Sequence, residues 1–229
     1  MVSTYLTRRA ELETYFGTTA ADAWARLTST APVSGVRATV RAGRDRMRAT
    51  LLSWLPPDLT GLRILDAGCG TGALAIEAAE RGATVVAIDL AGPLVDIARE
   101  RTPPGLPITY ATGDMLDPAL GMFDHVVAMD SIIHYRAEDM ARTIAGLAAQ
   151  CTGSVVFTFA PRTPLLTIMH AAGTLFPRRD RAPAIEPVRP RHIQALLRGT
   201  PTLAGWTPGR TLRIASGFYT SQAAELVRR

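Results

Sequence analysis

Apolar and polar positions along this chain follow two periods in turn, and their order predicts an α/β fold. Short apolar runs such as Ile64-Leu65 and Val155-Val156-Phe157 suit buried strands, and segments with helical spacing separate them. The expected strands cover residues 63–66, 84–89, 108–111, 123–129 and 154–160, and the helices between them cover 73–81, 93–101 and 138–149. Continuously apolar strands are typical of a parallel sheet that helices cover on both faces.

Two further helices are expected ahead of the first strand, from about residue 11 to 28 and from about residue 34 to 55. The apolar side of the second consists of Val36, Val40, Met47, Leu51 and Leu55. Pro56-Pro57 ends this helix, because proline disfavours helical backbone before it. We therefore expect residues 1–57 to form an N-terminal helical lid and residues 58–229 to form the core domain.

The pattern changes after Pro161, where an insertion of about residues 161–200 is expected. It contains a helix at 163–176, a stretch rich in proline and charge at 177–190, and a helix at 190–198. Such insertions build substrate lids or form plain surface loops, and the pattern allows both. Residues 205–219 have hairpin character, which predicts an antiparallel C-terminal strand, and the tail from Ser221 suits a strand or a helix.

A glycine-rich turn follows the first expected strand. The run from Asp66 to Gly72 contains Gly68, Cys69 and Gly70, and glycines let the backbone turn sharply and approach a ligand. An acidic residue ahead of these glycines resembles motif I of the S-adenosylmethionine-dependent methyltransferases, which have a Rossmann-like, mostly parallel (class I) sheet. The resemblance implies that Asp66 approaches the methionine part of the cofactor. The alternative is a glycine turn that binds nothing.

Further acidic residues stand at the ends of the next strands, which is the edge where open α/β sheets bind ligands. Asp89 lies about 20 residues past the glycines, where a carboxylate accepts ribose hydroxyls, and Leu90 follows it. The resemblance implies that Asp114 lies near the adenine amino group and that Met115 packs on the adenine ring. Asp130, after the fourth strand, completes the expected cofactor site. A single aspartate at a strand end is as often a cap or turn residue, but three together favour a site.

A nicotinamide dehydrogenase is the main competitor within this fold. The acid ahead of the glycine turn disfavours it, because the pyrophosphate at that helix N-terminus would meet a negative charge. S-adenosylmethionine has no phosphate and carries a sulfonium and an ammonium group, which carboxylates stabilise.

Motifs outside the cofactor turn make the resemblance more specific. They are Glu13 to Phe16 with Trp24, then Val33, Val36, Arg41 and Gly43, then His134-Tyr135, Phe159 to Leu166, Leu175 to Pro177, and Ser216 to Tyr219 with Ser221. Together they resemble the magnesium-protoporphyrin IX methyltransferases of bacteriochlorophyll and chlorophyll biosynthesis over nearly the whole chain. The chain departs from that family at Ser34 and Arg37, where members carry asparagine and glutamine, and near Thr28, where they carry a tyrosine. We therefore expect a polar contact of the lid to be lost or replaced by arginine.

The resemblance implies methyl transfer from S-adenosylmethionine to one propionate of magnesium-protoporphyrin IX, with magnesium present only as part of that substrate. A propionate is ionised near neutral pH, so it needs desolvation and alignment rather than a strong base. His134 and Tyr15 are the expected catalytic residues that position it, and His134 alternatively ligates the magnesium. Candidate residues of an apolar cleft, each also typical of plain core, are Phe16, Trp24, Leu165, Leu166, Met169 and Phe176.

Charge adds one further candidate. The chain has 229 residues and a formal net charge of +5, and Arg37, Arg41, Arg44 and Arg48 recur at helical spacing. They form either a solvated basic face or a surface for substrate carboxylates, anionic lipid or an acidic partner. The resemblance implies that the large porphyrin-binding subunit of magnesium chelatase hands over the substrate, and it is compatible with peripheral membrane contact.

Composition limits the alternative functions and the cellular location of the protein. Aromatic residues make up 6% and no RNA-binding motif is found, so no nucleic-acid partner is expected, although methylation of RNA or of another carboxylate stays an alternative. A non-catalytic S-adenosylmethionine-binding assembly protein is a third hypothesis. Two cysteines, no secretory or plant-type transit segment, and no apolar run of ~20 residues predict a cytoplasmic protein of a bacterial pathway.

Overall fold

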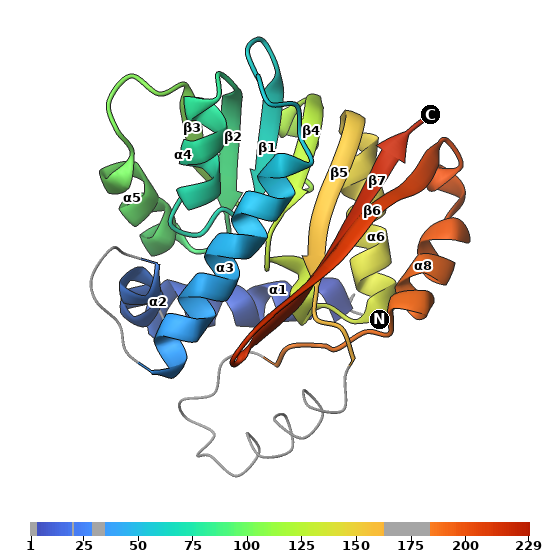
Figure 1. Cartoon of the computed structure of the whole chain (residues 1–229), viewed down its shortest axis with the longest axis horizontal. Helices are drawn as coiled ribbons and strands as arrows, with labels where there is room; N and C mark the ends of the chain where they lie inside the picture. Colours follow the sequence, from blue (N-terminus) through green and yellow to red (C-terminus); the bar gives the residue numbers. More distant parts are fainter. Residues whose placement is uncertain (1–3, 20, 29–34, 163–183) are drawn as a thin grey trace.

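A seven-stranded sheet forms the centre of the computed structural model, which describes residues 4–19, 21–28, 35–162 and 184–229 (Figure 1). The strands are β1 (Arg63–Ala67), β2 (Thr84–Asp89), β3 (Ile108–Thr112), β4 (Phe123–Ala128), β5 (Cys151–Phe159), β6 (Trp206–Ser216) and β7 (Tyr219–Arg228). Their order is β3-β2-β1-β4-β5-β7-β6, with β1 to β5 parallel. Since the order reverses at β1, a crevice is expected at the carboxyl ends of β1 and β4.

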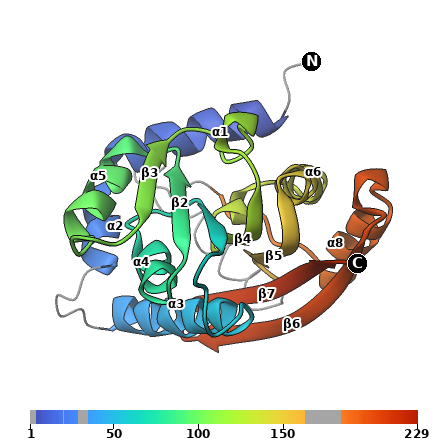
Figure 2. The same ribbon diagram turned by 90° about the horizontal axis from the view of Figure 1, so that it is seen from above.

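Helices cover both faces of this sheet, as the apolar strands predict. They are α1 (Thr4–Thr14), α2 (Ala21–Leu27), α3 (Val36–Ser53), α4 (Ala73–Glu80), α5 (Gly92–Arg101), α6 (Ala137–Ala149) and α8 (Pro190–Arg198), with 3-10 turns at Pro118–Leu120, Ile132–His134 and Pro201–Leu203. Figure 2 shows the sheet between α3 and α4 on one side and α1 and α6 on the other. Ile64 packs with the first pair and Leu65 with the second, and both are fully buried.

The N-terminal helix differs from the expected single helix at 11–28. It begins earlier, at Thr4, and a π-helical turn at Tyr15–Thr19 separates α1 from α2. The hydroxyls of Thr14 and Thr18 donate to backbone carbonyls four residues earlier, at 2.9 Å and 2.6 Å. Such bonds bend helices, and Gly17 between them weakens the helix further.

Helix α3 packs differently from the two helices before it. Its Met47, Leu51 and Leu52 have no exposed surface and contact the core of the sheet. All three helices contribute side chains to the wall of a cavity described below. Within the expected lid of residues 1–57, α3 is therefore also part of the core.

The C-terminal tail forms a long hairpin. β7 pairs antiparallel with both β5 and β6, so the tail after Ser221 continues as a strand. Its buried positions alternate, which fits a strand with one face on the core. The helix expected at 163–176, with Leu165, Leu166, Met169 and Phe176, lies outside the described residues, as do Val33, Ser34 and residues 177–183. In the described part of the chain, no helix is long and apolar enough to cross a membrane.

Candidate functional site

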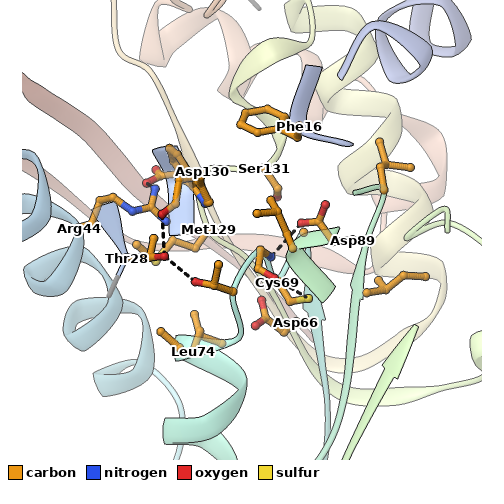
Figure 3. Close-up of a pocket in the computed structure, with 18 of the residues that line it drawn as sticks. Phe16, Thr28, Arg44, Asp66, Cys69, Leu74, Asp89, Met129, Asp130 and Ser131 are labelled. Carbon is orange, nitrogen blue, oxygen red and sulfur yellow. Dashed lines mark hydrogen bonds and ion pairs between the residues drawn. The ribbon is translucent and has the colours of Figure 1, made fainter. Parts of the chain in front are cut away.

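A cavity of about 450 Å³ opens at the carboxyl ends of β1, β2 and β4 (Figure 3). Most of the expected site residues line it: Asp66, Gly68, Cys69, Gly70, Asp89, Leu90, Met115 and Asp130 of the cofactor site, and the catalytic candidate His134. Three expected residues, Gly72, Asp114 and Tyr15, are not among the lining residues in the described part of the chain. The strand ends thus bring together side chains up to 68 positions apart, from Asp66 to His134.

Each glycine of the turn has a positive φ and a neighbouring side chain close to where a Cβ would lie, which explains why glycine stands there. Gly68 has φ +85°, and a Cβ there would lie 2.2 Å from the Ser131 Cβ. Gly70 has φ +53° and lies under the Trp24 indole. Gly72, at φ +82°, begins α4 and faces the Tyr110 hydroxyl, so it serves packing inside the fold rather than the cavity.

Two carboxylates approach each other beneath this turn. Asp66 is 1% exposed, and its Oδ2 has no hydrogen-bond partner among the described residues. Burial, reinforced by the nearby charge of Asp89, raises the pKa of Asp66 to about 7. Asp89 accepts hydrogen bonds from the backbone N–H groups of Gly70 at 2.8 Å and Ala91 at 2.9 Å. A buried carboxylate with an unpaired oxygen favours a cationic ligand.

The third acidic position, Asp114, has hydrogen-bond partners on α1. The Asp114 carboxylate accepts hydrogen bonds from the Tyr5 hydroxyl at 2.8 Å and from Arg9 at 2.6 Å, both on α1. Met115, one residue later, is buried in the cavity wall. The predicted contact of Asp114 with adenine stays a prediction, and the observed role of its side chain is to hold α1 over this loop.

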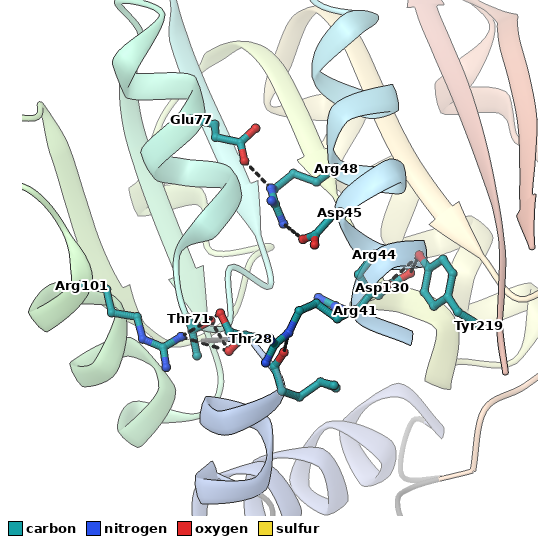
Figure 4. A network of polar contacts seen from close by, with 11 residues as sticks. Thr28, Arg41, Arg44, Asp45, Arg48, Thr71, Glu77, Arg101, Asp130 and Tyr219 are labelled. Carbon is teal, nitrogen blue, oxygen red and sulfur yellow. Dashed lines mark hydrogen bonds and ion pairs between the residues drawn. The ribbon is translucent and has the colours of Figure 1, made fainter. Parts of the chain in front are cut away.

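The wall above the turn comes from α2, and contacts that no sequence motif predicts hold this helix in place. Arg41 of α3 donates to the carbonyls of Leu27 and Arg26, and Arg101 of α5 donates to the Ala25 carbonyl and the Thr28 hydroxyl (Figure 4). Both guanidinium groups thus satisfy free carbonyls at the C-terminal end of α2. A threonine at 28 suits this role, because its hydroxyl also bonds Thr71 of the glycine turn at 2.9 Å.

The four arginines of α3 that recur at helical spacing do not form one solvated face. Arg48 donates to Glu77 and Asp45, Arg41 holds α2, and Arg44 donates to Asp130 at 2.6 Å, while Arg37 is exposed. The three later arginines line the cavity.

His134 lies at the far side of the cavity and is 7% exposed. Its Nδ1 is 3.3 Å from the Ala184 carbonyl oxygen, which can only accept, so Nδ1 carries the proton. The Phe16 ring packs edge-on against the imidazole, with ring centroids 6.0 Å apart. Tyr15 packs against Phe16 outside the cavity lining, with centroids 5.1 Å apart.

This sheet order, with a glycine turn after β1 and acids at the ends of β1 and β2, defines a class I methyltransferase. A family model described as "Methyltransferase domain" matches residues 64–152. A second model, "Magnesium-protoporphyrin IX methyltransferase C-terminus", matches residues 128–228.

Two curated relatives match along the full chain. A magnesium-protoporphyrin O-methyltransferase of Rhodobacter capsulatus is 48% identical, with 98% of this chain and 99% of that protein covered. One of Synechocystis is 30% identical over the whole of both chains. A crystal structure of magnesium protoporphyrin IX methyltransferase from Synechocystis PCC 6803 with bound SAH has a TM-score of 0.84 at 29% identity, covering 96% of this chain and 99% of that one. The chain belongs to the magnesium-protoporphyrin O-methyltransferase family.

Proposed function

We propose that this protein transfers the methyl group of S-adenosylmethionine to a propionate of magnesium-protoporphyrin IX, giving the monomethyl ester, in bacteriochlorophyll biosynthesis. The observation that carries the proposal is the 48% identity to the Rhodobacter capsulatus enzyme along the full length of both chains. The cavity is compatible with it, since it joins a glycine turn, the buried Asp66 and the half-buried Asp89 to a large apolar wall.

The cavity residues fit S-adenosylmethionine. The unpaired Oδ2 of Asp66 suits the cofactor's ammonium group, and Asp89 suits the ribose hydroxyls. Leu90 and Met115 offer apolar surface for adenine, beside Gly68 and Gly70 of the turn. When bound, the cofactor supplies a methyl group on a sulfonium, and a carboxylate oxygen that takes it leaves the carbon–sulfur electron pair on sulfur.

The tasks left to the chain are to remove water from the propionate and to align one of its oxygens. No proton is transferred, because the nucleophile is already a carboxylate. Phe16, Trp24 and Leu12 make the α1–α2 side of the cavity apolar, which favours a dry site. We propose that residues 1–57 supply this cover and that His134 and Tyr15 align the propionate.

We expect His134→Ala to lower turnover about 100-fold, because it removes a group that fixes the acceptor. Affinity for S-adenosylhomocysteine, measured by calorimetry, should stay unchanged. His192→Ala is the matched control, since that histidine is half exposed and lies outside the cavity. Near wild-type turnover of His134→Ala would remove His134 from the mechanism.

Porphyrin binding separates the two roles of His134. With Nδ1 donating to Ala184, the neutral ring has a lone pair on Nε2, which ligates a metal, whereas holding a carboxylate requires the imidazolium. If His134 ligates magnesium, His134→Ala weakens binding of magnesium-protoporphyrin but not of metal-free protoporphyrin. If it holds the propionate, both porphyrins bind more weakly.

Turnover of magnesium-protoporphyrin IX with methyl-labelled S-adenosylmethionine tests the proposed reaction. We expect labelled monomethyl ester. Porphyrin binding without label transfer would favour an assembly protein, and label transfer to RNA without porphyrin affinity would favour an RNA methyltransferase.

Cofactor binding should depend on pH through Asp66. Its pKa of about 7 means that the carboxyl group is largely neutral at pH 6 and largely ionised at pH 8. The ammonium group of S-adenosylhomocysteine requires the carboxylate, so affinity should fall up to about tenfold for each pH unit below 7. Calorimetry between pH 5.5 and 8 checks this, and Asp66→Asn should bind weakly with a flat pH profile. A sloping profile in Asp66→Asn would assign the dependence to another group.

Two further contacts extend the proposal: with the porphyrin-binding subunit of magnesium chelatase, and peripherally with a membrane. Supporting them, Phe218 at the β6–β7 hairpin tip and Val36 at the start of α3 are 53% and 51% exposed, and the exposed Arg37 follows Val36. Gly217 lies against Thr39 of α3, which keeps this apolar tip beside the basic helix start. We also propose a cytoplasmic location.

A further inference from the structure

The buried carboxylate of Asp130 in the cavity wall accepts hydrogen bonds from four side chains, and the proposed reaction does not explain this network. Asp130 follows β4 and adopts a φ of +52°, which is costly for a residue with a side chain. Its carboxylate accepts hydrogen bonds from Tyr219 at 3.1 Å, Ser221 at 3.2 Å and Thr158 at 3.1 Å. It also accepts from Arg44 at 2.6 Å. Strained backbone of this kind persists only where the surroundings hold it firmly, as three hydroxyls and a guanidinium do here.

The C-terminal hairpin reaches this carboxylate under α3. A Cβ at Gly43 would lie 2.4 Å from the Tyr219 ring, so only glycine leaves room for the ring there. Burial and the Asp130 charge raise the pKa of Tyr219, so its hydroxyl stays protonated and donates. Residues 219 and 221 belong to a motif that the cofactor site leaves unexplained. Figure 4 shows Tyr219 and Arg44 meeting Asp130 from opposite sides.

The group that this network holds is Arg44. Its side chain is 18% exposed, lines the cavity and stacks 4.6 Å from the centre of the Trp24 ring. Among the described residues it makes one hydrogen bond, through Nη1, so Nε and Nη2 keep donors for a ligand. The other cavity arginines differ, since Arg48 and Arg41 each use two nitrogens on protein partners.

We propose that Arg44 binds a ligand carboxylate in this cavity and that Asp130, held by Tyr219 and Ser221 of β7, positions it. The inference rests on the proposed function, which brings two carboxylate sources: the amino-acid carboxylate of the cofactor and the propionates of the acceptor. Arginine recognises either one by two parallel N–H···O bonds. Positioning matters because a guanidinium already fixed by Asp130 and Trp24 loses little freedom when the ligand binds.

Binding of three ligands to the purified chain tests the proposal. S-adenosylhomocysteine has the amino-acid carboxylate, 5′-methylthioadenosine lacks it, and magnesium-protoporphyrin has the propionates. We expect Arg44→Gln to lower the affinity for one of the two carboxylate ligands about 10- to 100-fold. Its affinity for 5′-methylthioadenosine should stay within about twofold of the wild-type value. A lower affinity for S-adenosylhomocysteine would show that Arg44 binds the amino-acid carboxylate of the cofactor. A lower affinity for the porphyrin alone would show that it binds a propionate. The affinity of Arg44→Lys for that ligand should lie between those of the wild type and Arg44→Gln.

The control is Arg46→Gln, which removes the same charge from an exposed position of the same helix and should change nothing. Tyr219→Phe should lower the affinity for the same ligand about threefold to tenfold in the wild-type background. In the Arg44→Gln background it should have no effect, because Tyr219 acts through Arg44. An Arg44→Gln protein that binds S-adenosylhomocysteine and the porphyrin as tightly as the wild type overturns the proposal. A wild-type chain without porphyrin affinity refutes the proposed function, while the two nucleoside ligands still report on Arg44.

Discussion

Replacing Gly68 by alanine is expected to lower turnover at least about 100-fold and to reduce the free energy of unfolding by about 2–5 kcal/mol. Two costs combine at this position. The φ of +85° is unfavourable for any residue with a Cβ, and the new Cβ would lie 2.2 Å from the Ser131 Cβ. Relief requires the turn or the β4 end to move, and both line the cavity. Urea unfolding and turnover of the purified variant measure the two effects.

Gly61→Ala separates the two costs. Gly61 has a similar φ of +78°, but a Cβ there meets nothing within 4 Å. This variant should lose about 1 kcal/mol of stability and keep full turnover. If Gly68→Ala behaved like Gly61→Ala, backbone strain alone would act at the turn, and the close packing on Ser131 would be irrelevant to the site.

Asp89→Ala is expected to weaken S-adenosylhomocysteine binding at least about 100-fold. The change removes the proposed ribose acceptor, and it also leaves the N–H groups of Gly70 and Ala91 without their carboxylate. The glycine turn then loses the bond that ties it to the end of β2. Calorimetric titration measures the affinity, and thermal unfolding of the ligand-free variant reports the structural part.

Asp117→Ala is the matched control for that experiment. Asp117 is exposed, and its carboxylate accepts a backbone N–H from Ala119 at 2.9 Å, in the same turn geometry as Asp89 with Ala91. It lies outside the cavity, so the variant should bind the cofactor normally. Equal losses in both variants would show that a capped turn, rather than a ribose contact, explains the effect at Asp89.

Local pattern determined the sheet and the first half of the site. Apolar strand runs fixed β1 to β5, and parallel strands bring their carboxyl ends to one edge, so Asp66 and Asp89 had to meet there. Family motifs added His134, which lies in the same cavity. None of these inferences required knowing how distant helices pack.

The surroundings of Asp114 and Tyr15, by contrast, depend on such packing. Asp114 follows its strand as expected, but α1 begins at Thr4 and brings Tyr5 and Arg9 to its carboxylate. Tyr15 sits in a π-helical turn that hydroxyl-to-carbonyl bonds favour, and Phe16 rather than Tyr15 lines the cavity. Single-residue shifts within a helix turn a side chain by about 100°, which sequence spacing alone does not resolve at an irregular turn.

The sequence by itself therefore determined the methyltransferase sheet, its cofactor turn and the family, because strand periodicity and short motifs are local properties. Only the tertiary structure decided what the arginines of α3 do. Helical spacing shows that Arg41, Arg44 and Arg48 share a side, but their partners come from α2, from Asp130 just past the end of β4, and from α4. Hydrogen bonds and ion pairs of this kind form when the sheet order and the C-terminal hairpin set which elements meet, and that is a property of the packed molecule.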